Sequence, residues 1–308
     1  MTELLEFLLT ESPTPPAIES VAAAWQHHRT VADRFESPVD IAAAAGFGAD
    51  RLGYAFLSGY RAALQKLLPA IPSDSMVALC ATESGGGHPS AIKTLLTPSG
   101  DGWELTGTKS FVTLGSAADV LIVFATTGTS AQGQNQLRAV SVDSKSPGVR
   151  IDDREPLEFA PEIPHAALTL DRVAVSPDDV LPGDAYSLYL KPFRTIEDLH
   201  VLAAGIGWLT QIARRSDWPP NIVERLLALL TTVRALAAAQ ASAASTHIAL
   251  GGTFTLFIEL LDDLETQWTT TDPELRELWA RDRPLLSIAG FVRAKRLEAA
   301  WRTLTLGG

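Results

Sequence analysis

The spacing of apolar and polar residues changes twice along the chain. Residues 17–70 are rich in Ala and Leu, and "FLSGYRAALQKLL" within them repeats apolar side chains every three or four positions. This spacing predicts an amphipathic helix. Its apolar stripe consists of Phe56, Tyr60, Ala63, Leu64 and Leu67. The segment "AIPSDS" at 70–75 indicates a linker by its Pro and Ser content.

Between residues 76 and 183 the period becomes that of strands. Short runs with β-branched residues, such as "GWELTGTKSFVTLG" and "ADVLIVFATTG", are bounded by Gly, Asp, Ser and Pro. "SGDGW" at 99–103 has the composition of a hairpin turn. The pattern predicts antiparallel strands of a barrel or sandwich.

From residue 195 onward the pattern is helical again. "TIEDLHVLAAGIGWLTQIARR" predicts a helix that begins at Thr195 as N-cap and carries Glu197 and Asp198 in its first turn. Further helical segments joined by short loops indicate a bundle. The predicted fold class is therefore α+β and multidomain. It has an N-terminal helical domain over 1–75, a middle β-domain over 76–183 and a C-terminal helical bundle over 184–308.

Composition narrows the functional classes. The 308 residues carry a formal net charge of -11 and show no basic patch, so we expect no nucleic-acid partner. The N-terminal "MTELLEFLLTES" lacks the basic region of a signal peptide, and the apolar stretch at 199–213 is short and interrupted by polar residues. We therefore expect a cytoplasmic protein with no membrane partner. The single cysteine, Cys80, lies in an apolar run and is expected to be a small buried side chain.

Most sequence motifs for chemistry are absent. There is no Cys cluster and no His-Glu-x-x-His, and His27 and His28 would point about 100° apart on a helix, so no metal is expected. "GIGW" at 205–208 lacks the third glycine of a dinucleotide site and lies in a helical pattern, which indicates close helix packing. The triple glycine of "ATESGGGHPS" at 81–90 has no Gly-Lys-Ser/Thr after it. By itself it fits a flexible turn or a backbone that approaches a ligand.

The order of helices, short strands and helices resembles the acyl-CoA dehydrogenase family, and motifs in the middle region add to the resemblance. The segment 82–89, "TESGGGHP", is similar to the family's Thr-Glu-Pro-x-Ala-Gly-Ser-Asp, and 102–109, "GWELTGTK", to its Gly-Trp-x-Leu-x-Gly-x-Lys. The segment 111–115, "FVTLG", resembles Trp-Ile-Thr-Asn-Gly. "LTLDRVAVSPDDVLPG" resembles the Phe-Asp-x-Val-x-Val-Pro segment that follows. The resemblance covers residues 76–215.

The resemblance implies an FAD site and an activity. Thr82, Gly86 and Gly87 would border the cofactor, Phe111 would stack on the flavin ring, and the Thr113 hydroxyl would point to its N5 side. We expect these residues to line one concave surface where the β-domain meets the bundle. The implied activity is that of a flavoprotein oxidoreductase, which acts on the CH–CH group of an acyl thioester with FAD as hydride acceptor. The implied assembly is a homodimer or a hetero-oligomer with a homologous subunit.

Departures from the family pattern keep other functions open. His88-Pro89 replaces Ser-Asp, the family's late Gln-x-x-Gly-Gly has only Gly307-Gly308 as a counterpart, and the glutamate that follows it in the family has none. Some family members place the base on the first bundle helix, where Asp198 would align; the alternative is an Asp that complements the helix dipole. The chain is then an oxidoreductase, a non-catalytic subunit or ligand-binding scaffold without a base, or an unrelated protein with chance similarity.

Overall fold

The computed structural model describes residues 2–305 and contains two compact units. A helical unit comprises the chain up to Pro69, the segment Glu158–Glu162 and the chain from Phe193 onward. A β-domain comprises Ala70–Leu157 and Ile163–Pro192. The helices predicted at the two ends of the chain therefore share one unit. Gly307 and Gly308 lie outside the described residues.

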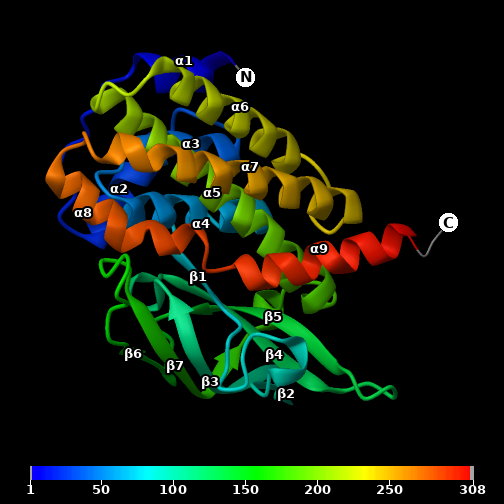
Figure 1. The fold of residues 1–308 in the computed structure, drawn as a ribbon. Coiled ribbons are helices and arrows are strands. Elements are labelled where there is room, and N and C mark those ends of the chain that lie inside the picture. Colours follow the sequence, from blue (N-terminus) through cyan, green and yellow to red (C-terminus); the bar gives the residue numbers. More distant parts are fainter. Residues whose placement is uncertain (1, 306–308) are drawn as a thin grey trace. The chain divides into compact units, whose positions relative to one another are not determined.

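The helical unit packs helices from both ends of the chain against one another (Figure 1). Their bounds are α1 Thr2–Thr10, α2 Val21–Ala32, α3 Pro38–Phe47, α4 Leu52–Leu67, α5 Lys191–Arg215, α6 Pro220–Ala237, α7 Ala244–Trp268, α8 Pro273–Asp282 and α9 Gly290–Thr305. Local sequence sets several of their starts. The Ser20 hydroxyl accepts a hydrogen bond from Ala23 N–H at 3.1 Å and caps α2, and the Asp272 carboxylate caps α8 through Glu274 N–H at 2.9 Å.

Helix α5 is buried along most of its length, and Trp208 and Leu209 on it are 0% exposed. Its small residues allow close approach to α3. A Cβ on Gly207 would lie 2.0 Å from the carbonyl oxygen of Ala43, which no side chain tolerates. The interpretation of "GIGW" as a helix-packing segment is confirmed.

Four tryptophans close the end of the helical unit near α8. Trp268 stacks on Trp279 with ring centroids 4.9 Å apart and meets Trp218 edge-on at 5.0 Å, and Trp208 stacks on both Trp268 and Trp279. The indole N–H of Trp218 donates to the Thr271 hydroxyl at 3.0 Å. Such aromatic contacts add about 0.5–1.5 kcal/mol each to the burial of the rings.

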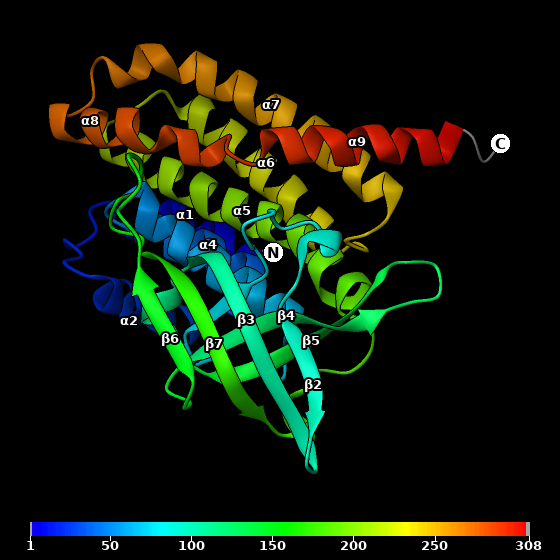
Figure 2. The same ribbon diagram turned by 90° about the horizontal axis from the view of Figure 1, so that it is seen from below.

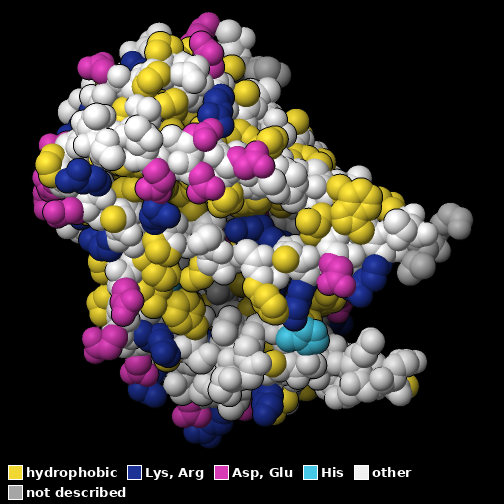
Figure 3. Space-filling model, viewed as in Figure 1, with side chains coloured by type: hydrophobic (Ala, Val, Ile, Leu, Met, Phe, Trp, Pro, Cys, Tyr) yellow, Lys and Arg dark blue, Asp and Glu magenta, His cyan; other side chains and the backbone are white. Residues whose placement is uncertain are grey.

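Helices α7 and α9 form an outer layer of this unit. α7 packs against α6 and α9, and by length and composition it is apolar enough to cross a membrane, with a mean hydropathy of 1.3. A core helix passes the same test. Apolar side chains are exposed where α9 runs beside α7 (Figure 3). The exposed large apolar residues in and before α9 include Ile288, Phe291, Trp301 and Leu304.

The β-domain is a seven-stranded, curled sheet (Figure 2). Its strands are β1 Val77–Cys80, β2 Leu95–Ser99, β3 Gly102–Thr113, β4 Val120–Thr129, β5 Asn135–Asp143, β6 Val149–Asp153 and β7 His165–Val175. The predicted hairpin is confirmed, since Ser99 pairs with Gly102 and Gly100 takes a positive φ of 58°. Cys80 is fully buried, as predicted, and burial raises its thiol pKa to about 12.

The sheet is mixed in direction. Its order is β1-β4-β2-β3-β7-β6, and β5, which lies off this path, pairs with β4. The β2·β3, β3·β7, β4·β5 and β6·β7 pairs are antiparallel, as predicted, whereas β1·β4 and β2·β4 are parallel. The expectation of antiparallel strands is wrong at these two pairs, because β4 follows the β2–β3 hairpin in the chain and runs in the same direction as β1 and β2.

Candidate functional site

A buried ion pair joins the two motifs of the β-domain. Lys109 Nζ donates to Glu83 Oε1 at 2.7 Å and to the carbonyl of Phe124 at 2.6 Å. Its side chain is 0% exposed and that of Glu83 is 7% exposed. Glu83 also accepts from Lys93 N–H at 2.8 Å and from the Thr94 hydroxyl at 2.7 Å. The pair therefore fixes the loop between β1 and β2 on β3 and β4.

The pKa of Glu83 shows that the pair outweighs burial. Burial alone raises this pKa, but the hydrogen bond and charge of Lys109, with the bonds from Thr94 and Lys93, bring it below its ordinary value of 4.5. Burial lowers the pKa of Lys109, and Glu83 opposes that effect. Both residues stand in the quoted motifs, but no role was predicted for either from the sequence.

The glycine loop after Glu83 is a tight turn. Gly86 N–H donates to the Glu83 carbonyl at 2.8 Å, and Glu83 N–H donates to the Gly86 carbonyl at 3.2 Å. Gly86 has φ +97°, which favours glycine, and a Cβ there would meet nothing within 4 Å. The N–H of Gly86 is thus engaged within the turn. A ligand could still approach the backbone of Gly86 closely from the side where a Cβ would meet no atom. The next residue, Gly87, is half-buried.

Three predicted residues share one face of the β-domain. Thr82 forms a bridge with Phe111, and directly opposed residues of antiparallel strands point to the same side. Phe111 and Thr113 are two positions apart on β3, so they also point to one side. An irregularity between Lys109 and Val112 turns those two side chains to the core. Thr82, Phe111 and Thr113 therefore lie together, each half-buried.

The chemistry of this face fits the ring end of a flavin. Among residues 2–305, the hydroxyls of Thr82 and Thr113 have no hydrogen-bond partner, and both flank the half-exposed ring of Phe111. His165 packs on that ring at 4.4 Å between centroids, and the Arg154 guanidinium lies 5.9 Å from its centre. Burial lowers the pKa of His165, so the imidazole is neutral at pH 7. His165 and Arg154 belong to none of the motifs quoted from the sequence, so neither residue was predicted for this face.

Asp198 belongs to the helical unit and does not lie in a first turn. Helix α5 begins at Lys191, after a π-helical turn at Tyr186–Leu190, so Asp198 is in its third turn and the predicted N-cap at Thr195 is wrong. Asp198 is 7% exposed. Its oxygens accept from Arg293 Nη1 at 2.9 Å and from Arg296 Nη2, both on α9. Its position thus depends on side chains almost a hundred residues away.

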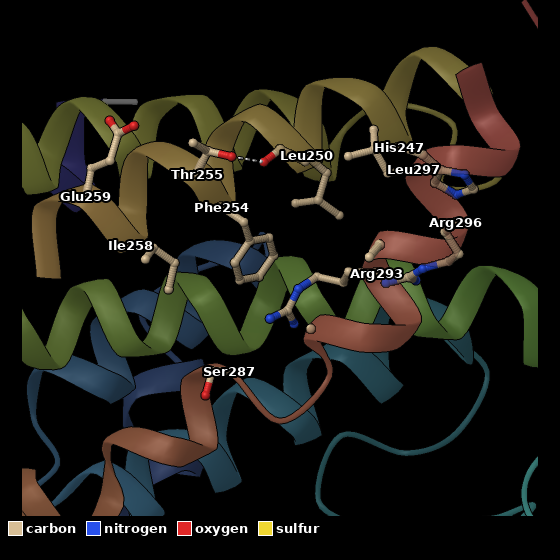
Figure 4. A pocket seen from close by; sticks show the side chains of 13 residues that line it. His247, Leu250, Phe254, Thr255, Ile258, Glu259, Ser287, Arg293, Arg296 and Leu297 are labelled. Atoms are coloured by element: carbon tan, nitrogen blue, oxygen red, sulfur yellow. Dashed lines mark hydrogen bonds between the residues drawn. The ribbon is translucent and has the colours of Figure 1, made fainter. Parts of the chain in front are cut away.

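Glu197 and a groove between α7 and α9 lie next to the ion pairs of Asp198. Burial, together with the nearby charge of Asp198, raises the pKa of the half-buried Glu197 to about 7, although Arg194 and Arg296 oppose this rise. Beside the arginines, α7 and α9 enclose a cavity of about 420 Å³ (Figure 4). Within the described part of the chain, no group of three or more His, Cys, Asp and Glu residues could hold a metal ion.

Comparison with known proteins places these features in context. The signature of the family described as "Acyl-CoA dehydrogenase, middle domain" matches residues 78–173. A probable short/branched chain specific acyl-CoA dehydrogenase of Dictyostelium discoideum is 32% identical over 119 residues, which cover 38% of this chain and 29% of that protein. A cyclohex-1-ene-1-carbonyl-CoA dehydrogenase of Syntrophus aciditrophicus is 36% identical over 33% of this chain and 25% of its own length. The chain thus matches less than a third of either relative.

The likeness in fold extends further than the likeness in sequence. Butyryl-CoA dehydrogenase from Megasphaera elsdenii superimposes with a TM-score of 0.70 at 14% identity, over 97% of both chains. PigA in its FAD complex superimposes with a TM-score of 0.65 at 15% identity, over 88% of this chain and 82% of its own. At such identities the agreement concerns the fold.

Proposed function

We propose that the chain is a member of the acyl-CoA dehydrogenase family and an FAD-dependent oxidoreductase acting on the CH–CH group of an acyl thioester. The observation that carries the proposal is the face formed by Thr82, Phe111 and Thr113, where an aromatic ring lies between two unpartnered hydroxyls. Bound FAD supplies the hydride acceptor for such a reaction. We keep the cytoplasm as the proposed location, in line with the acidic composition.

The residues of the chain have distinct proposed roles. Phe111 offers a ring face for stacking, and the hydroxyls of Thr82 and Thr113 supply fixed hydrogen bonds. The turn at Gly86 and Gly87 lets the backbone come close to the cofactor because no side chain intervenes. Desaturation also requires a base for the α-proton, and Asp198 is the candidate. Each of its oxygens keeps a lone pair beyond the one engaged by a guanidinium.

The test compares Asp198 with a matched carboxylate in the same unit. Asp40 is bound by Arg234 at 2.6 and 2.7 Å and is similarly buried, but it has no proposed chemical role. We expect Asp198→Asn to retain flavin and to lose bleaching by acyl-CoA, whereas Asp40→Asn retains both. Flavin absorbance before and after addition of acyl-CoA measures this. Bleaching of Asp198→Asn at the wild-type rate would remove Asp198 from the mechanism.

The second candidate is a non-catalytic family member that serves as a subunit or ligand-binding scaffold. It is favoured by the two guanidiniums on Asp198, which give this residue a role in holding α9. Purified chain that is colourless and does not take up added FAD would support this candidate and contradict the first.

We also propose that the chain forms a homodimer or pairs with a homologous subunit. The support is the exposed apolar surface of α9, where Phe291 is 71% and Trp301 51% exposed. By contrast, the segment 222–240 contributes no large exposed apolar side chain among the described residues. Sedimentation as a monomer at micromolar concentration would contradict the proposal.

A further inference from the structure

The groove between α7 and α9 combines apolar walls with a fixed basic end. Leu250, Phe254 and Ile258 of α7 and Leu297 of α9 provide most of the apolar wall (Figure 4). Arg293 and Arg296 lie toward one end of the row of lining side chains, and Glu259 lies at the other. Its volume of about 420 Å³ falls within the range of ligand pockets, about 300–1,000 Å³.

The guanidiniums of Arg293 and Arg296 are held in place by hydrogen bonds to other groups of the protein. Arg293 donates to Asp198 and to the Leu286 carbonyl at 3.3 Å, and its guanidinium carbon lies 3.8 Å from the centre of the Phe254 ring. Arg296 donates to Asp198 and to the Thr195 hydroxyl at 3.2 Å. Each guanidinium has five N–H donors, so several remain for a ligand. Because their side chains are only 15% and 17% exposed, both are fixed before any ligand arrives.

The charge of this end selects the ligand. Among the three groups in direct contact here, the two guanidiniums exceed the one carboxylate of Asp198 by one positive charge, which a monoanion balances and a dianion exceeds. Guanidinium forks match the planar geometry of a carboxylate. We propose that this groove binds a free apolar monocarboxylate, with its carboxylate on Arg293 and Arg296 and its tail between α7 and α9. The thioester group at the end of an acyl chain carries no charge where this ligand has its carboxylate, so this ligand is distinct from the proposed substrate.

The test uses decanoate as the probe and the full chain as purified. Isothermal calorimetry below the micellar concentration is expected to show one site for decanoate and at least tenfold weaker binding of decan-1-ol, which has the same tail without the charge. Arg296→Gln is expected to lower the affinity for decanoate at least tenfold. Equal binding of decanoate and decan-1-ol, or no binding of decanoate, would overturn the proposal.

A second pair of variants keeps the proposal testable if Arg296→Gln does not fold. Ala294 lines the groove and is exposed, so Ala294→Trp fills the groove without entering the core. Ala299, also exposed on α9, does not line the groove and provides the matched control. Decanoate affinity is expected to fall at least tenfold in Ala294→Trp and to stay unchanged in Ala299→Trp. If Ala294→Trp instead binds decanoate normally, or abolishes self-association of a chain that binds no decanoate, the groove has another occupant and the proposal fails.

Discussion

Replacement of Lys109 by Met tests whether the buried pair with Glu83 holds the β-domain together. The change removes the 2.7 Å bond to Glu83 and the 2.6 Å bond to the Phe124 carbonyl, and it leaves a carboxylate that is 7% exposed without its cation. Loss of one partner from a buried pair costs about 3–5 kcal/mol. At about 2–4 °C per kcal/mol, the melting temperature should fall by roughly 10 °C.

The control is an exposed pair in the same domain. Arg150 and Asp152 meet at 2.6 Å with 66% and 47% of their side chains exposed, so Arg150→Met should cost less than about 1 kcal/mol. Urea unfolding followed by circular dichroism measures both variants. If Lys109→Met costs no more than Arg150→Met, the pair does not stabilise the fold as argued.

The pair also predicts a pH dependence. The pKa of Glu83 is lowered in the folded chain, so the ionised carboxylate contributes to the free energy of unfolding. This contribution is fully present above the ordinary pKa of 4.5 and is lost as the pH falls below 4.5 toward the pKa of the folded state. Wild type should therefore lose more stability than Lys109→Met over this acidic range. Equal losses in the two proteins would contradict the assignment.

Two further predictions concern the helical unit. Burial lowers the pKa of His28 from 6.5 to about 3. Below pH 6.5 this imidazole is therefore protonated in the unfolded chain but stays neutral in the folded chain. The free energy of unfolding then falls by about 1.4 kcal/mol for each pH unit below 6.5. His28→Phe keeps the stack on Trp25 and should reduce that slope in urea titrations by the same amount; an unchanged slope would refute the assignment. Gly207→Ala should destabilise by about 1–3 kcal/mol through its clash with Ala43, whereas Gly252→Ala, with open space at its Cβ, should stabilise by up to about 1 kcal/mol. Melting temperatures that shift alike in these two variants would contradict the packing argument.

The elements predicted from sequence are those that local periodicity controls. The hairpin at 99–102, the strand runs and most helices follow from side-chain spacing and turn residues. The parallel β1·β4 pairing does not, because it depends on where a distant strand enters the sheet. The start of α5 was misplaced although a signal exists: Pro192 stands in the first turn, where proline is favoured.

For the candidate site, motifs identified residues but not their contacts. The resemblance selected Thr82, Phe111 and Thr113; their spacing on β3 places Phe111 and Thr113 on one face, but only the Thr82–Phe111 bridge shows that Thr82 shares it. The glycine run fitted a flexible turn or a backbone that approaches a ligand, whereas the structure shows a tight turn in which the Gly86 N–H donates to the Glu83 carbonyl. Hydrogen bonds of this kind depend on φ and on a partner's position, which residue types alone do not determine.

The contacts of Asp198 also could not be predicted from the sequence, and they affect its proposed role as the base. Its place on α5 follows from alignment, but its partners Arg293 and Arg296 lie 95 and 98 residues further along the chain. A carboxylate that takes a substrate proton must present a lone pair to that proton, and two guanidiniums restrict the directions from which a substrate can approach. Any movement of α9 therefore changes both the access to Asp198 and the basic end of the groove. The proposed base and the proposed carboxylate site are coupled through the same two arginines.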